Sequence, residues 1–130
     1  MKKFIGLALV SAMALALIGG ATAATAQTSQ AGAVIRTGAC SGASTWKLTL
    51  KTDAGRIESD VEVQTPKAGQ AWHFGMFDNG VKFGSGTKTT MADGSWSATR
   101  FAANQAGADN IVVKAKNLVT GETCRAKATF

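Results

Sequence analysis

Between residues 45 and 130, apolar and polar side chains alternate at nearly every position, and short turn sequences interrupt the alternation. A period of two places apolar side chains on one face of a β-strand and polar side chains on the other. Trp46, Leu48 and Leu50, for example, alternate with lysine and threonine. Helical periodicity is missing beyond the N-terminal segment. The pattern therefore predicts an all-β domain.

The alternation, divided at the turn sequences, predicts strands at 45–51, 56–64, 71–78, 81–88, 95–101, 110–116 and 122–130. About seven short strands in one domain predict an immunoglobulin-like two-sheet sandwich, with a small closed barrel as the alternative. We expect the first, second and fifth strands in one sheet and the other four in the second. Trp72 then lies where an immunoglobulin-type sandwich buries its tryptophan. The chain has no Tyr for a tyrosine corner, so the likeness is architectural.

The strongest turn signal is the Asn-Gly pair at 79–80, which stands between two apolar runs. This pair favours a two-residue type I′ hairpin turn. In such a hairpin we expect Met76 opposite Phe83 on the inner side and Phe77 opposite Lys82 on the outer side.

Residues 1–26 have the three parts of a secretory signal peptide. Two lysines precede an uncharged apolar run from Phe4 to Ile18, and an Ala-Thr-Ala sequence ends at Ala26. The run of 15 residues is shorter than the about 20 that a spanning helix needs. We therefore expect cleavage between Ala23 and Gln27. The mature protein would be secreted or cell-wall associated, without a membrane span.

Cleavage after residue 26 leaves 104 of the 130 residues, which is enough for one ordinary domain. The two N-terminal lysines leave with the signal peptide, so the formal net charge falls from +6 to +4. A charge of this size does not by itself indicate a nucleic-acid partner. We expect residues 27–39 to be a flexible leader and residues 40–130 to form the sandwich domain.

Cys40 and Cys124 are the two cysteines of the chain. In an oxidising compartment an isolated pair is most simply one disulfide. Two free thiols or a metal pair are the alternatives. A metal would need further ligands, and His73 is the single histidine. No metal and no cofactor are expected, since no dinucleotide or phosphate-binding loop is visible.

Catalytic patterns are weak in this chain. A Ser-His-Asp set would have to use His73, and no Gly-x-Ser-x-Gly elbow frames a nucleophile. Glu58, Asp60 and Glu62 are spaced by two, which indicates a solvated charged strand face rather than a cation site. Asp109 is expected to pair with Arg100 and to brace a corner of the sandwich. We expect a non-enzymatic protein with no catalytic residue.

A more informative feature is the segregation of charge between the two expected sheets. The outer face of the second sheet is predicted to carry Lys82, Lys114, Lys116, Arg125 and Lys127, together with His73, Phe77 and Val112. Glu58, Asp60 and Glu62 fall on the outer face of the first sheet. A basic face with an aromatic neighbour can dock an anionic partner, such as an envelope polymer or a secreted protein. The alternative is that outer lysines only keep the sheet soluble and protect its edges.

Four segments of the chain carry a resemblance to known proteins: Cys40–Leu48, Asp78–Gly80, Gly107–Ile111 and Thr120–Cys124. They resemble small secreted actinobacterial proteins of unknown function with an immunoglobulin-like sandwich. The resemblance implies a secreted β fold and pairing of Cys40 with Cys124. It carries over no functional residue.

The favoured function is a secreted binding or envelope-associated module that uses the basic sheet face. One alternative is a carrier of a small apolar ligand, with Trp72, Trp96 and Phe83 lining a cleft. A secreted inhibitor that acts through an exposed loop is a further alternative.

Overall fold

The computed structural model describes residues 27–28 and 32–130. The expected signal peptide at 1–26 lies outside the described residues. The strands are β1 (Gln27–Thr28), β2 (Ala33–Ala39), β3 (Thr45–Asp53), β4 (Arg56–Gln64), β5 (Ala71–Asp78), β6 (Val81–Thr89), β7 (Ser95–Ala103), β8 (Asn110–Asn117) and β9 (Thr123–Thr129). All seven strands that the alternation predicts are present, with bounds within two residues of those expected.

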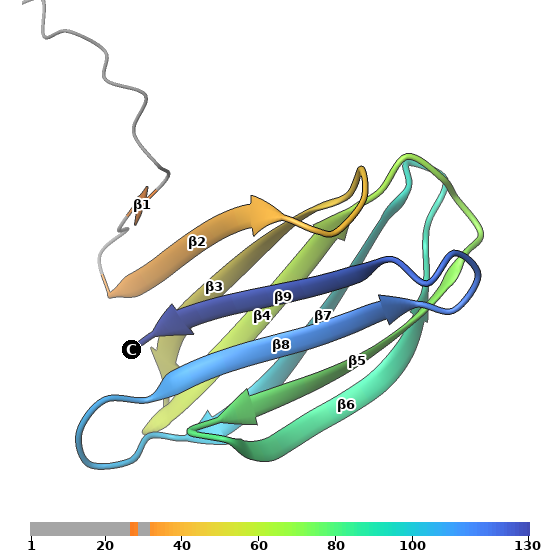
Figure 1. The fold of residues 1–130 in the computed structure, drawn as a ribbon. Helices are drawn as coiled ribbons and strands as arrows, with labels where there is room; N and C mark the ends of the chain where they lie inside the picture. The colour runs from red at the N-terminus through yellow and green to blue at the C-terminus, as the bar shows by residue number, and fades with distance from the viewer. Residues whose placement is uncertain (1–26, 29–31) are drawn as a thin grey trace, which may run out of the picture.

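The strands form two antiparallel sheets that lie face to face (Figure 1). One sheet has the order β1-β2-β3-β4-β7, and the other has the order β6-β5-β8-β9. The all-β fold and the assignment of each predicted strand to its sheet are confirmed.

The core between the sheets consists of the inward-facing apolar residues of both. Its fully buried large side chains include Trp72, Trp96, Phe74, Leu48, Leu50, Ile57, Met76, Ile111, Val61, Val63 and Val113. The Trp72 and Trp96 rings lie 6.0 Å apart between centroids, and Phe74 stacks on Trp96 at 5.6 Å. Both tryptophans thus pack against other aromatic rings inside the sandwich.

The expectation of a flexible leader over residues 27–39 is wrong for its second half. Ala33–Ala39 is strand β2, which pairs with β3 over its whole length. The sequence of β2 lacks a clear alternation because its inner positions include Arg36, opposite Leu48, and Gly38, opposite Trp46. A Cβ atom on Gly38 would lie 2.5 Å from the Trp46 ring, so the indole takes the space of a side chain. Backbone pairing and this close approach define the strand.

The Asn79-Gly80 turn is confirmed, but the register beyond it differs from the expected one. Asn79 and Gly80 both have positive φ, 48° and 86°, as a type I′ turn requires. Phe77 pairs with Lys82 as expected. Met76 pairs with Gly84 rather than with Phe83, because a β-bulge interrupts the register. The alternation of apolar and polar residues does not indicate the extra residue on β6, which is Phe83.

Cys40 and Cys124 form the expected disulfide, which links residues 84 positions apart. Cys40 follows β2 and Cys124 belongs to β9, so the bond ties an edge region of one sheet to an edge strand of the other. Among the described residues no helix is long and apolar enough to cross a membrane.

Candidate functional site

The four strands β5, β6, β8 and β9 carry a strong excess of positive charge. They contain six Lys or Arg residues and a single acidic residue, Asp78, whose exposed fraction is 4%. On the first sheet, by contrast, oppositely charged side chains of β3 and β4 stand opposite one another, and Lys51 lies 3.3 Å from Glu58. The two sheets therefore present faces of different charge to the solvent.

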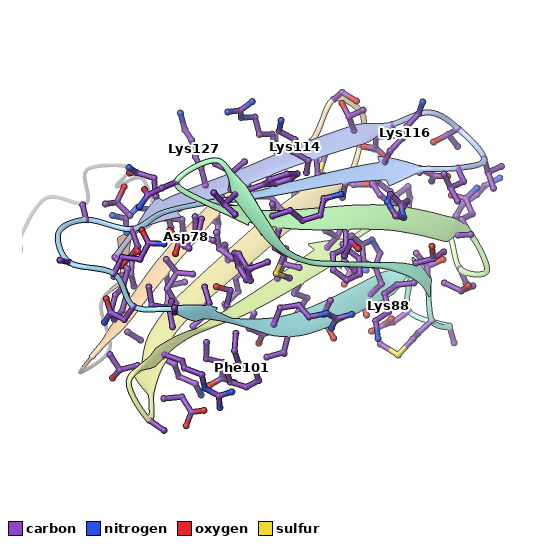
Figure 2. The ribbon with its side chains drawn as sticks, turned by 90° about the horizontal axis from the view of Figure 1, so that it is seen from below. Asp78, Lys88, Phe101, Lys114, Lys116 and Lys127 are labelled. Carbon is purple, nitrogen blue, oxygen red and sulfur yellow. A yellow bond between two sulfur atoms is a disulfide. The ribbon has the colours of Figure 1, made fainter. Side chains whose placement is uncertain are left out.

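The strand register arranges the basic residues in three rows across the second sheet. The first row consists of His73 on β5, Lys116 on β8 and Thr123 on β9. The second row consists of Gly75 on β5, Lys114 on β8 and Arg125 on β9. In the third row, β6 contributes Lys82, β5 Phe77, β8 Val112 and β9 Lys127. Figure 2 shows Lys114, Lys116 and Lys127 projecting from the side of the sandwich opposite Phe101. We call His73, Phe77, Lys82, Lys114, Lys116, Arg125 and Lys127 the basic face.

The structure thus brings together the residues that the sequence proposes for a binding surface. The basic side chains and His73 are exposed, and Phe77 is half-buried. Adjacent strands are about 5 Å apart, and successive outward residues on one strand are about 7 Å apart. Lys114, Lys116, Arg125 and Lys127 on β8 and β9 therefore repeat at these two spacings, and Lys82 on β6 stands apart from them across β5.

Phe77 holds two of these cations in place. The Lys82 Nζ lies 5.7 Å from the centroid of the Phe77 ring, and the Lys114 Nζ lies 5.2 Å from it. Each contact is a cation–π attraction between the ammonium group and the ring. The aromatic side chain thus limits the motion of two lysines that would otherwise be free in solvent.

A shallow groove of about 530 Å³ runs through the basic face, with Gly75 in its floor. The groove is lined mainly by His73, Phe77, Lys82, Lys114, Lys116 and Arg125. A second hollow of about 560 Å³ shares Phe77, Lys114 and Arg125 and continues toward Asn110. A Cβ atom on Gly75 would lie 3.3 Å from the Phe77 ring, so a side chain there would close the groove. Glycine within a strand often marks such a close approach.

His73 has no close contact with a carboxylate. Its Nδ1 lies 3.5 Å from the Thr87 hydroxyl, at the exposed end of the groove. Two of the three acidic residues on β4, Glu58 and Asp60, contact other side chains. Burial raises the pKa of Asp60, and the Thr99 hydroxyl, which donates to Asp60 at 3.2 Å, opposes that rise. Within the described part of the chain no group of three metal-ligating side chains occurs.

The expected Asp109–Arg100 pair is absent. The Arg100 guanidinium lies 5.2 Å from the centroid of the Phe74 ring and donates to the Ser85 carbonyl at 3.2 Å. Arg100 therefore covers the side of the core between β6 and β7. The prediction was wrong because Asp109 is turned inward, toward another residue.

That residue is Asp78, at the end of β5. Asp109 is fully buried, and its Oδ2 and the Asp78 Oδ1 are buried without a conventional donor. Burial first, then the charge of Asp109 and a hydrogen bond to it, raise the pKa of Asp78 to about 6. Asp78 therefore holds its proton more tightly than an exposed aspartate does, as a carboxyl group buried beside another carboxyl group is expected to. The sequence showed Asp78 only as a turn residue, and no signal linked it to Asp109.

Comparison of the chain with protein families, with curated proteins and with solved structures finds no match. The functional conclusion therefore depends on the geometry and charge of the basic face.

Proposed function

We propose that the protein is an exported, non-enzymatic module that binds a linear anionic polymer of the cell envelope through the basic face. The observation that carries the proposal is the array of five Lys and Arg side chains on strands whose single acidic residue is buried. The N-terminal sequence and the disulfide support export, since disulfides persist in oxidising compartments.

The spread of the cations favours a polymer over a compact anion. Lys82 and Lys127 stand at opposite edges of the sheet, three strand spacings apart, which is about 14 Å. One phosphate or carboxylate group cannot contact both. A polymer with an anionic group about every 5–7 Å matches the spacing between neighbouring cations on the basic face and can contact several of them at once.

The direct test compares two triple variants with the same change in net charge. Lys114→Gln, Lys116→Gln and Arg125→Gln neutralise the basic face. Lys47→Gln, Lys51→Gln and Arg56→Gln neutralise two lysines and one arginine on the other sheet. Each exposed ion pair contributes roughly 0.5–1 kcal/mol, so we expect the first variant to bind isolated envelope polymer about tenfold to hundredfold more weakly at low salt.

The second variant should bind like the wild type. Equal losses in both variants would mean that net charge alone drives retention, and no loss in the first would overturn the proposal. Polyphosphate and polyglutamate as competitors distinguish phosphate from carboxylate as the preferred anionic group.

Gly75→Thr tests the groove without changing any charge. Because the new side chain would displace the Phe77 ring, we expect weaker binding at unchanged net charge. Wild-type affinity of this variant would show that the ligand does not enter the groove.

A further inference from the structure

One end of the sandwich exposes a cluster of large apolar side chains. The described residues include five exposed large hydrophobic residues, and three of them are Met91, Leu118 and Val119, with exposed fractions of 56%, 57% and 67%. Met91 follows β6, and the other two follow β8. Both strands pair antiparallel with β5, so they end on the same side of the molecule. Figure 1 shows the β8–β9 turn projecting at this end.

The turn that carries Leu118 and Val119 is held rigidly. Asn117 is buried, and its Oδ1 accepts hydrogen bonds from the backbone N–H of Val119 at 2.8 Å and of Thr120 at 3.1 Å. The Asn117 Nδ2 donates to the Gln70 Oε1 at 2.8 Å. The Leu118 N–H donates to the Ala71 carbonyl at 2.8 Å. The apolar tip is therefore fixed in an outward position and cannot fold back onto the core.

Lysines stand behind this apolar tip. Lys88 and Lys116 lie near the ends of β6 and β8, and Figure 2 shows both at the end of the sandwich opposite Asp78. Lys67 is exposed in the connection between β4 and β5, where the Gly69 N–H donates to the Thr90 carbonyl at 2.9 Å. Three exposed cations thus accompany the three exposed apolar side chains.

The two acidic residues in the β8–β9 and β6–β7 connections at this end, Glu122 and Asp93, accept internal hydrogen bonds. The Glu122 carboxylate accepts from the Gly42 N–H at 3.0 Å and from the Ser44 N–H and hydroxyl at 2.9 and 2.7 Å. The Asp93 Oδ1 accepts from the Ser95 N–H at 2.9 Å and the Ser95 hydroxyl at 2.7 Å. These hydrogen bonds lower the pKa of Asp93. The lysines have no acidic partner within salt-bridge distance among the described residues.

We infer that this end docks on the surface of an anionic lipid bilayer. Leu118, Val119 and Met91 insert at the boundary between headgroups and acyl chains, and the lysines contact the anionic headgroups. A projecting apolar tip with cations behind it matches an interface that is apolar inside and negatively charged at its surface. This inference goes beyond the proposed function and depends on other residues, apart from the shared Lys116.

The test uses vesicles of phosphatidylcholine with phosphatidylglycerol, and the protein recovered after export with its N-terminus determined by mass spectrometry. Val119→Ser is compared with Val81→Ser, because both valines are 67% exposed and Val81 lies at the other end, in the β5–β6 hairpin. Any residual N-terminal segment is the same in both variants. We expect Val119→Ser to lower vesicle binding by about tenfold, since a buried valine side chain is lost.

Val81→Ser should bind vesicles like the wild type, and Lys88→Gln should bind about fivefold more weakly. Vesicles of pure phosphatidylcholine should bind much less protein than mixed vesicles. Equal binding by Val119→Ser and the wild type, or equal loss in both serine variants, would overturn the inference, and so would binding without anionic lipid. Polyphosphate binding should be unchanged in Val119→Ser, so failure here is distinguishable from failure of the proposed function.

Discussion

Replacing Asp78 by asparagine should stabilise the protein at neutral pH and remove a part of its pH dependence. In the wild type the buried Asp78 Oδ1 and Asp109 Oδ2 have no hydrogen-bond donor, and burial and the nearby Asp109 raise the pKa of Asp78. Above this pKa Asp78 loses its proton and becomes a negative charge in a buried site. The asparagine amide keeps the shape of the side chain and offers a permanent N–H donor.

The size and sign of the effect follow from the pKa of Asp78. The pKa is about 6 in the folded protein, against the ordinary value of 3.8. Between these values the folded state binds the proton more tightly than the unfolded state, so stability falls as pH rises from about 4 to about 6 and then stays level. A shift of this size corresponds to about 3 kcal/mol. Asp78→Asn should be more stable than the wild type by up to that amount at about pH 7.5.

Urea unfolding of both proteins at several pH values measures this effect. The difference between the unfolding free energies of variant and wild type should grow from about pH 4 to about pH 6. Asp93→Asn is a suitable control because Asp93 is exposed and hydrogen bonds lower its pKa, so this variant should not gain stability with pH. A difference between Asp78→Asn and the wild type that does not vary with pH would refute the interpretation that the folded protein raises the pKa of Asp78.

Three further changes test the fold. Replacing Cys40 and Cys124 by serine opens a link across 84 positions and should lower the unfolding free energy by about 4–5 kcal/mol in urea melts; a loss below about 1 kcal/mol would contradict this. Ala54 has a φ of 50°, so Ala54→Asn should raise stability by about 1 kcal/mol, measured as a higher Tm. A Cβ on Gly84 would lie 2.6 Å from the Arg100 side chain. Gly84→Val should therefore destabilise the protein, and Arg100→Ala should relieve part of that loss in a double-mutant cycle.

The alternation of apolar and polar residues was sufficient to predict most of the fold. It locates seven strands because one face of each must be apolar to form the core, and the Asn79-Gly80 turn joins two of them. It could not reveal β2, because the inner positions of that strand include a charged residue, Arg36, and a residue without a side chain, Gly38. The sequence pattern also could not predict the bulge beside Met76, since one extra residue on β6 shifts the strand pairing and leaves no mark in the residue types.

The basic face was predictable for the same reason as the strands. A period of two that places Val113 and Ala115 in the core must place Lys114 and Lys116 outside. The buried carboxyl pair was not predictable, because Asp109 lies in the connection between β7 and β8, outside any periodic segment. Contacts made by such connections depend on tertiary packing alone.

The most direct test of polymer binding by the basic face is a lysine-protection experiment. The protein is acetylated with and without bound envelope polymer, and the rate at each lysine is read by mass spectrometry. The proposal predicts slower acetylation of Lys82, Lys114 and Lys127, and unchanged rates at Lys47 and Lys51 on the other sheet. Equal protection of both sheets, or protection confined to Lys47 and Lys51, would contradict it.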